Sequence, residues 1–112
     1  MQYAQIGAIK VSRFIVGSNP FSGFSHQSIE MDAAMRHYFS SSSIKSVLHR
    51  AEALGVNTVI ARTDYHVIRL LTEYWDEGGT IQWFAQTCPE VGSHAACIER
   101  AANNGAKAVH LH

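Results

Sequence analysis

The chain has 112 residues, an apolar fraction of 46%, and nine basic and nine acidic side chains. This length allows one domain or part of one, and the apolar fraction is sufficient for a real core. With no net charge and no run of like charges, binding to nucleic acid or to an anionic membrane surface is not expected. No signal-peptide pattern or apolar stretch of about 20 residues is present, so we expect a soluble, cytoplasmic protein.

Short runs of β-forming residues alternate with helical patterns along the chain. Residues 1–12 are expected to form a short hairpin. Strands are expected over residues 13–19, 56–62, 81–87 and 106–112. Apolar residues at helical spacing predict helices over 29–39, 44–54, 65–77 and 93–104. We expect Ser43 to cap the helix 44–54, because serine favours that position.

Regular alternation of strands and helices indicates a parallel sheet with right-handed crossovers. A flat sheet covered on both faces needs strands that are apolar at every position. Instead, Gln82, Phe84 and Gln86 alternate with a fully apolar set in the third strand, which favours a barrel. The expected fold is the N-terminal half of a (β/α)8 TIM barrel: a single partial domain over residues 1–112, with strands one to four and helices one to three in residues 13–112.

A complete barrel has eight units and about 250 residues. Four units leave two open sheet edges, which are prone to pair with another strand. We therefore expect a missing C-terminal half-barrel as partner, or self-association through the open edges.

The expected strands place polar side chains where barrel enzymes have active sites, at the carboxyl ends of the strands. The ring formed in this way contains Asn19, Arg62, Gln86, His110 and His112. The following loops add Ser18, Ser22, His26, Asp64, Tyr65, His66 and Cys88. A small-molecule substrate is the expected ligand of such a ring.

Each of these residues also has a structural interpretation. Arg62 brings a fixed charge into an enclosed space, which needs an anionic ligand or a carboxylate such as Asp64. Asp64 precedes a helix and fits an N-cap. Asn19 before Pro20 either orients a substrate oxygen or stabilises a turn.

His110 and His112 are two residues apart on one expected strand and therefore share a face. Imidazoles in this arrangement can bind a divalent metal or exchange protons with a substrate, and His110 alone fits a hydrogen-bonded interior histidine equally well. Cys88 and Cys97 lack the spacing of a zinc or dithiol motif, and we interpret them as ordinary reduced thiols.

The opening of the chain resembles that of aldo/keto reductases. The resemblance is carried by Ile6–Gly7, Lys10–Arg13, the run Val16–Gly23 and the helix end Ala51–Asn57, and it covers the first half of the chain best. It implies a barrel with a hairpin at its bottom and hydride transfer from NADPH to a carbonyl group. NADP(H) in the full-length protein is therefore the expected cofactor.

The catalytic residues of that family map onto this chain one position at a time. The tyrosine that acts as general acid falls on Tyr65, and the histidine falls on His112. The aspartate position holds Ile60, and the lysine position falls near Gln86 or Thr87, where a cation is missing.

Three hypotheses for function follow. The first is a divergent aldo/keto reductase-like enzyme acting on a small polar carbonyl or sugar-like metabolite, with Tyr65 and His112 as acid/base groups and Arg62 as an anchor. In this hypothesis Asn19, Gln86, His110, Asp64 and His66 bind the substrate. The second is a metal-dependent lyase, isomerase or hydrolase using His110 and His112. The third is a half-barrel without catalytic activity.

Overall fold

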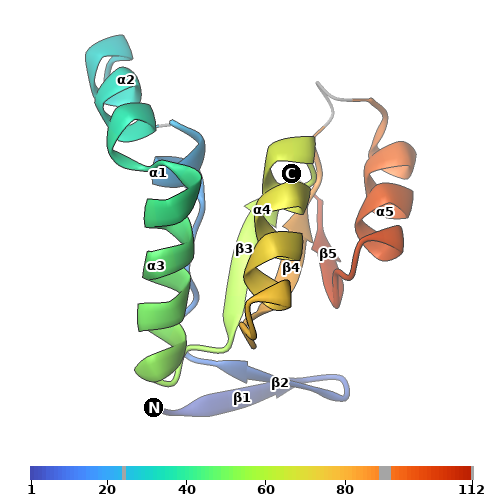
Figure 1. Cartoon of the computed structure of the whole chain (residues 1–112). Helices are drawn as coiled ribbons and strands as arrows, with labels where there is room; N and C mark the ends of the chain where they lie inside the picture. Colours follow the sequence, from blue (N-terminus) through green and yellow to red (C-terminus); the bar gives the residue numbers. More distant parts are fainter. Residues whose placement is uncertain (24, 89–91, 112) are drawn as a thin grey trace.

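The computed structural model describes residues 1–23, 25–88 and 92–111. This part of the chain forms two small sheets and five helices (Figure 1). The strands are β1 (Tyr3–Ile6), β2 (Ile9–Ser12), β3 (Thr58–Arg62), β4 (Gln82–Gln86) and β5 (Ala108–His110). The helices are α1 (Asn19–Ser22), α2 (Ile29–Tyr38), α3 (Ser41–Ala53), α4 (Tyr65–Asp76) and α5 (His94–Asn103).

The hairpin expected over residues 1–12 is present as the antiparallel pair β1–β2. It lies across the end of the molecule at which the parallel strands begin (Figure 1). Asn57 fastens it there: its Oδ1 accepts from the N–H of Ser12 at 2.8 Å, and its Nδ2 donates to the carbonyl of Lys10 at 3.0 Å. Nε2 of Gln82 donates to the same carbonyl at 2.8 Å. Side-chain amides thus join the hairpin to the parallel sheet.

The second sheet consists of β3, β4 and β5 in that order, all parallel. Helices α4 and α5 connect successive strands, as parallel pairing requires. Each of the two helices is preceded by a residue whose side chain caps the first turn of the helix. Oδ1 of Asp64 accepts from the N–H of Val67 at 2.8 Å, and the Ser93 side chain accepts from the N–H of Ala96 at 3.1 Å. These caps fix where each helix starts relative to the strand before it.

The core lies between one face of the parallel sheet and a layer formed by α3, α4 and α5, which stand side by side in Figure 1. Alternation along the strands explains this arrangement, since alternate side chains point to opposite faces. The core-facing set in the strands is Val59, Ala61, Trp83 and Ala85. The helices contribute Ile44, Leu48, Val67, Leu70, Leu71, Tyr74 and Ala101. The opposite face carries the half-buried Ile60, Arg62, Gln82 and Gln86.

The prediction of the N-terminal half of a (β/α)8 barrel is wrong. Instead of four consecutive strand–helix units, the described residues form a three-stranded parallel sheet, a separate two-stranded antiparallel sheet and five helices. The strand expected over residues 13–19 is reduced to one isolated bridge between Val16 and Val59. Pro20 has no N–H for a sheet ladder and fits the first helical turn, so the chain turns into α1 at Asn19. Helix α2 then intervenes before α3.

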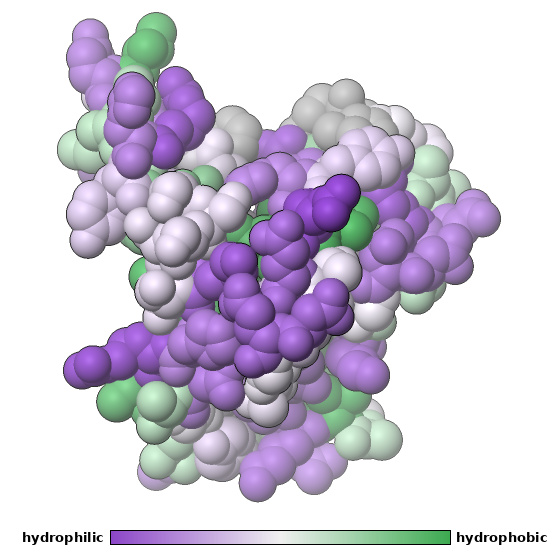
Figure 2. Space-filling view, viewed as in Figure 1, coloured by the Kyte–Doolittle hydropathy of each residue, from purple (hydrophilic) through white to green (hydrophobic). Residues whose placement is uncertain are grey.

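The outer side of the helix layer is polar. Figure 2 shows a predominantly hydrophilic surface over the helices that face the viewer in Figure 1. Nζ of Lys45 on α3 lies 3.4 Å from Glu73 on α4 and 2.8 Å from Glu77 at the C-terminal end of α4. These ion pairs join α3 to α4. Among the residues that the structure describes, no helix is both long enough and apolar enough to cross a bilayer.

Candidate functional site

Three of the polar residues expected at the strand ends lie side by side. Arg62 on β3 pairs with Gln86 on β4, and Gln86 pairs with His110 on β5. They form one row because the three parallel strands are in register at their carboxyl ends. Arg62 and Gln86 are half-buried and His110 is exposed. His112 lies outside the described residues.

Arg62 is held by groups of its own chain. Its Nε lies 3.4 Å from Oδ2 of Asp64, and its Nη2 donates to Sγ of Cys88 at 2.7 Å. The side chains of Arg62 and Asp64 are 18% and 22% exposed, so the pair is largely shielded from water. Asp64 also caps α4 through its other oxygen. These contacts favour the structural interpretation of both residues, because the charge of Arg62 is balanced without an anionic ligand.

An open hollow of about 340 Å³ lies beside this row. Its lining among the described residues is Gly17, Ser18, Asn19, Pro20, Ile60 and Gln86. The hollow brings together two of the expected substrate-binding amides, Asn19 from the start of α1 and Gln86 from the end of β4. Arg62, His110 and Tyr65 are outside this lining set. Among the described residues, the lining combines polar and apolar groups and includes no charged side chain.

The side chain of Asn19 is positioned by His26, one of the loop residues expected near the ring of polar strand ends. Nδ2 of Asn19 lies 3.1 Å from Nε2 of His26. Because an amide nitrogen only donates, Nε2 of His26 accepts in this contact. His26 has a φ of 59°, a left-handed conformation that is uncommon outside glycine. The contact between Asn19 and His26 depends on the conformation of the loop between them, which the spacing of residues in the sequence does not predict.

Tyr65, the expected general acid, lies at the first turn of α4 and is 68% exposed. The guanidinium carbon of Arg100 lies 4.9 Å from the centre of its ring, in a cation–π contact between α4 and α5. This contact turns Tyr65 toward α5, and the side chain does not line the hollow.

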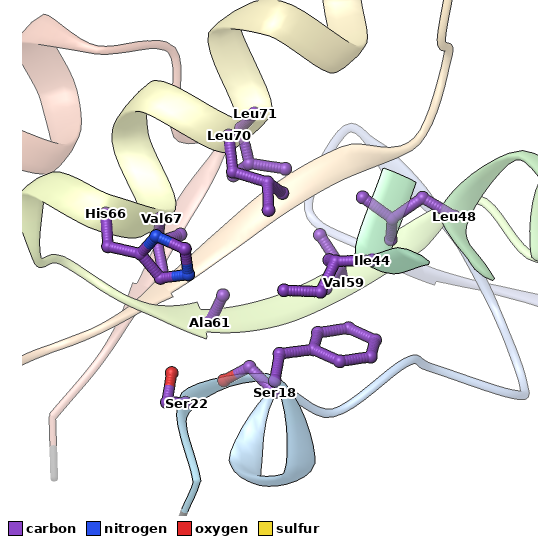
Figure 3. Close-up of a pocket in the computed structure, with 11 residues that line it drawn as sticks. Ser18, Ser22, Ile44, Leu48, Val59, Ala61, His66, Val67, Leu70 and Leu71 are labelled. Carbon is purple, nitrogen blue, oxygen red and sulfur yellow. The ribbon is translucent and has the colours of Figure 1, made fainter. Parts of the chain in front are cut away.

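His66 lines a different cavity, with Ser18 and Ser22 across from it (Figure 3). The rest of that lining is apolar: Phe21, Ile44, Leu48, Val59, Ala61, Val67, Leu70 and Leu71. The cavity measures about 20 Å³, on the order of one water molecule. It is therefore a gap in the packing between α1 and the helix layer, too small for a metabolite.

The metal hypothesis depends on His110 and His112 together, and His112 is not described. Within residues 1–23, 25–88 and 92–111, no group of three or more His, Cys, Asp or Glu side chains could hold a metal ion. The metal hypothesis stays a prediction.

Comparisons of this chain with protein-family models, with curated proteins and with solved structures find no match. The resemblance to aldo/keto reductases therefore stays a prediction from residues 6–57.

Proposed function

We propose that this protein binds a small, neutral, oxygen-rich metabolite, such as a carbonyl compound or a short sugar, in the hollow beside the carboxyl ends of the parallel strands. One observation carries the proposal. The amides of Asn19 and Gln86, which come from distant parts of the sequence, line a single open hollow of about 340 Å³. Ligand sites typically combine a concave shape with a few convergent polar groups of this kind.

The chemistry of the lining supports a neutral ligand. Each amide offers an oxygen acceptor and two N–H donors, which suits carbonyl and hydroxyl groups. Ile60 adds an apolar surface, and a Cβ atom at Gly17 would meet nothing within 4 Å, so the backbone there borders open space. An ionic ligand would lose its hydration without meeting an opposite charge among the described lining residues, which costs free energy.

NADP(H), the cofactor implied by the family resemblance, does not fit this hollow. Its phosphates require cationic side chains or the N–H groups of a helix start. The lining among the described residues contains neither lysine nor arginine. The helix that starts there, α1, has only four residues and carries Pro20, which has no N–H, in its first turn. Arg62 nearby is engaged by Asp64 and Cys88. Carbonyl reduction therefore stays a prediction, and the proposal here is limited to binding.

The experiment is a calorimetric titration with glyceraldehyde, dihydroxyacetone and glycerol as neutral probes and glycerate as an anionic probe. Asn19→Ala and Gln86→Ala are each expected to weaken binding of the best neutral probe by about tenfold, which corresponds to about 1.4 kcal/mol. Gln5→Ala is the matched control, because Gln5 is an exposed amide on the distant hairpin. Binding of glycerate alone, or an equal effect of all three substitutions, would contradict the proposal.

A further inference from the structure

The two cysteines of the chain lie in contact, although their spacing in the sequence does not match a dithiol motif. Cys88 follows β4, and Cys97 lies in the first turns of α5. The N–H of Cys88 donates to Sγ of Cys97 at 3.3 Å, and that thiol donates to the carbonyl oxygen of Cys88 at 3.2 Å. Both residues are buried, with 1% and 0% of their surface exposed.

This geometry places the pair within reach of a disulfide. The N–Cα bond is about 1.5 Å long, so Cα of Cys88 lies within about 5 Å of Sγ of Cys97. Since Sγ is two bonds from its own Cα, the two Cα atoms lie close to the range of roughly 4.4 to 6.8 Å that a disulfide needs. The remaining movement is a rotation of the Cys88 side chain, which now points its sulfur at Nη2 of Arg62.

One guanidinium group lies near each sulfur atom. Arg62 donates to Cys88 at 2.7 Å, and Nη1 of Arg100 lies 4.0 Å from Sγ of Cys97 while donating to the carbonyl of Thr63 at 3.0 Å. Burial by itself raises the pKa of the Cys97 thiol. Hydrogen bonds with Thr63 and with the backbone of Cys88, together with Arg100, outweigh burial and lower the pKa of this thiol. The thiolate is the form of cysteine that reacts with oxidants. Because both residues are buried, a peroxide reaches the sulfur atoms only when the chain around them opens locally.

We propose that Cys88 and Cys97 form a redox-active pair that a peroxide oxidises to an intramolecular disulfide. The Cys97 thiolate attacks one oxygen of hydrogen peroxide, the O–O bond breaks, and Cys97 becomes a sulfenic acid. The hydroxide that leaves takes up the proton lost by the Cys97 thiol and forms one water molecule. The Cys88 sulfur then attacks the sulfenic sulfur, the S–O bond breaks, and a second water molecule leaves. Two electrons pass from the two thiols to one peroxide molecule.

The disulfide has a consequence for the neighbouring strand ends. Rotation of the Cys88 side chain toward Cys97 removes the sulfur from Nη2 of Arg62, which leaves the ion pair with Asp64 as a remaining contact of the guanidinium. Oxidation therefore rearranges the residue that pairs with Gln86 at the edge of the sheet. This reaction does not depend on ligand binding in the hollow.

The test treats the folded wild-type protein with hydrogen peroxide and follows intact mass and free thiols. The expected result is a mass lower by two hydrogen atoms, loss of both thiols in a monomeric chain, and full reversal by dithiothreitol. In Cys88→Ser, a sulfenic acid on Cys97 should accumulate and react with dimedone. Addition of two or three oxygen atoms to one cysteine in the wild type, a disulfide between two chains, or unchanged thiols at peroxide concentrations that oxidise free cysteine would each overturn the proposal.

Discussion

The hydroxyl group of Tyr74 organises the turn between α4 and β4, and its removal is the most informative test of the fold. The side chain is fully buried. Its hydroxyl donates to Oε1 of Glu52 on α3 and accepts from the N–H groups of Thr80 and Ile81, each at 3.1 Å. Tyr74→Phe keeps the ring and deletes all three hydrogen bonds.

The expected loss of stability is large for the removal of one atom. A hydrogen bond to a charged group contributes about 1.5 to 3 kcal/mol, and a buried N–H without a partner costs about 1 to 3 kcal/mol. In Tyr74→Phe, the N–H of Thr80 keeps a 3.4 Å contact with Glu52. The N–H of Ile81 loses the hydroxyl that accepts from it. We expect the free energy of unfolding of Tyr74→Phe to fall by about 3 kcal/mol, and its Tm by on the order of 10 °C.

The assay is urea unfolding followed by tryptophan fluorescence, with Tyr38→Phe as control. Tyr38 is 73% exposed, so the control should change stability by less than about 0.5 kcal/mol. A loss below about 0.5 kcal/mol in Tyr74→Phe would refute the reasoning.

The difference between wild type and Tyr74→Phe should also depend on pH. The hydrogen bond from Tyr74 is the main cause that lowers the pKa of Glu52 below its ordinary value of 4.5. This stabilisation is complete above pH 4.5 and is lost as the pH falls through the lowered pKa of the folded state. Burial, and then the hydrogen bond to Glu52, raise the pKa of Tyr74 from 10.0 to about 12. That contribution is complete below pH 10 and declines as the pH rises toward about 12. A difference that is constant at all pH values would contradict this account.

Three further substitutions, two of them with a matched control, test the packing and one helix cap by urea unfolding. Gly79→Ala should destabilise by about 1 to 3 kcal/mol, because its Cβ would lie 2.2 Å from a buried phenol ring, whereas Gly17→Ala meets nothing within 4 Å and should be nearly neutral. Leu48→Ala removes a side chain that is 1% exposed and should cost about 2 to 5 kcal/mol, and Leu54→Ala, 64% exposed, is its control. Asp64→Ala should cost more than the ~1 kcal/mol of a lost cap, because it also removes the carboxylate that pairs with Arg62. Equal losses within either matched pair, or no loss at Asp64, would count against these explanations.

Parts of the fold follow directly from local patterns in the sequence. Helices α4 and α5 were predictable because a capping residue, Asp64 or Ser93, precedes apolar residues at helical spacing. For α3 the expected cap was wrong by three residues. Ser40, not Ser43, accepts from the first turn, and Phe39 before it packs against the core. In a run of four serines, the apolar residue before the cap decides the helix start.

The barrel prediction failed where two local preferences compete. Residues 13–19 favour an extended chain, but Pro20 favours a helix start, and the structure has α1 there with one bridge at Val16. Alternation in β4 correctly indicated that Gln86 points away from the core. The contacts of Asn19 with His26 and of Cys88 with Cys97 depend on how loops return to the sheet, which spacing along the chain does not reveal.

The most direct test of the proposed function is an NMR titration of the 15N-labelled protein with glyceraldehyde, observing the side-chain amides of Asn19 and Gln86. If the hollow is the binding site, both amide signals should shift with one common dissociation constant, while the amide of Gln5 on the hairpin stays unchanged. If the two signals stay fixed, or shift with different dissociation constants, the hollow is not a binding site for a neutral metabolite.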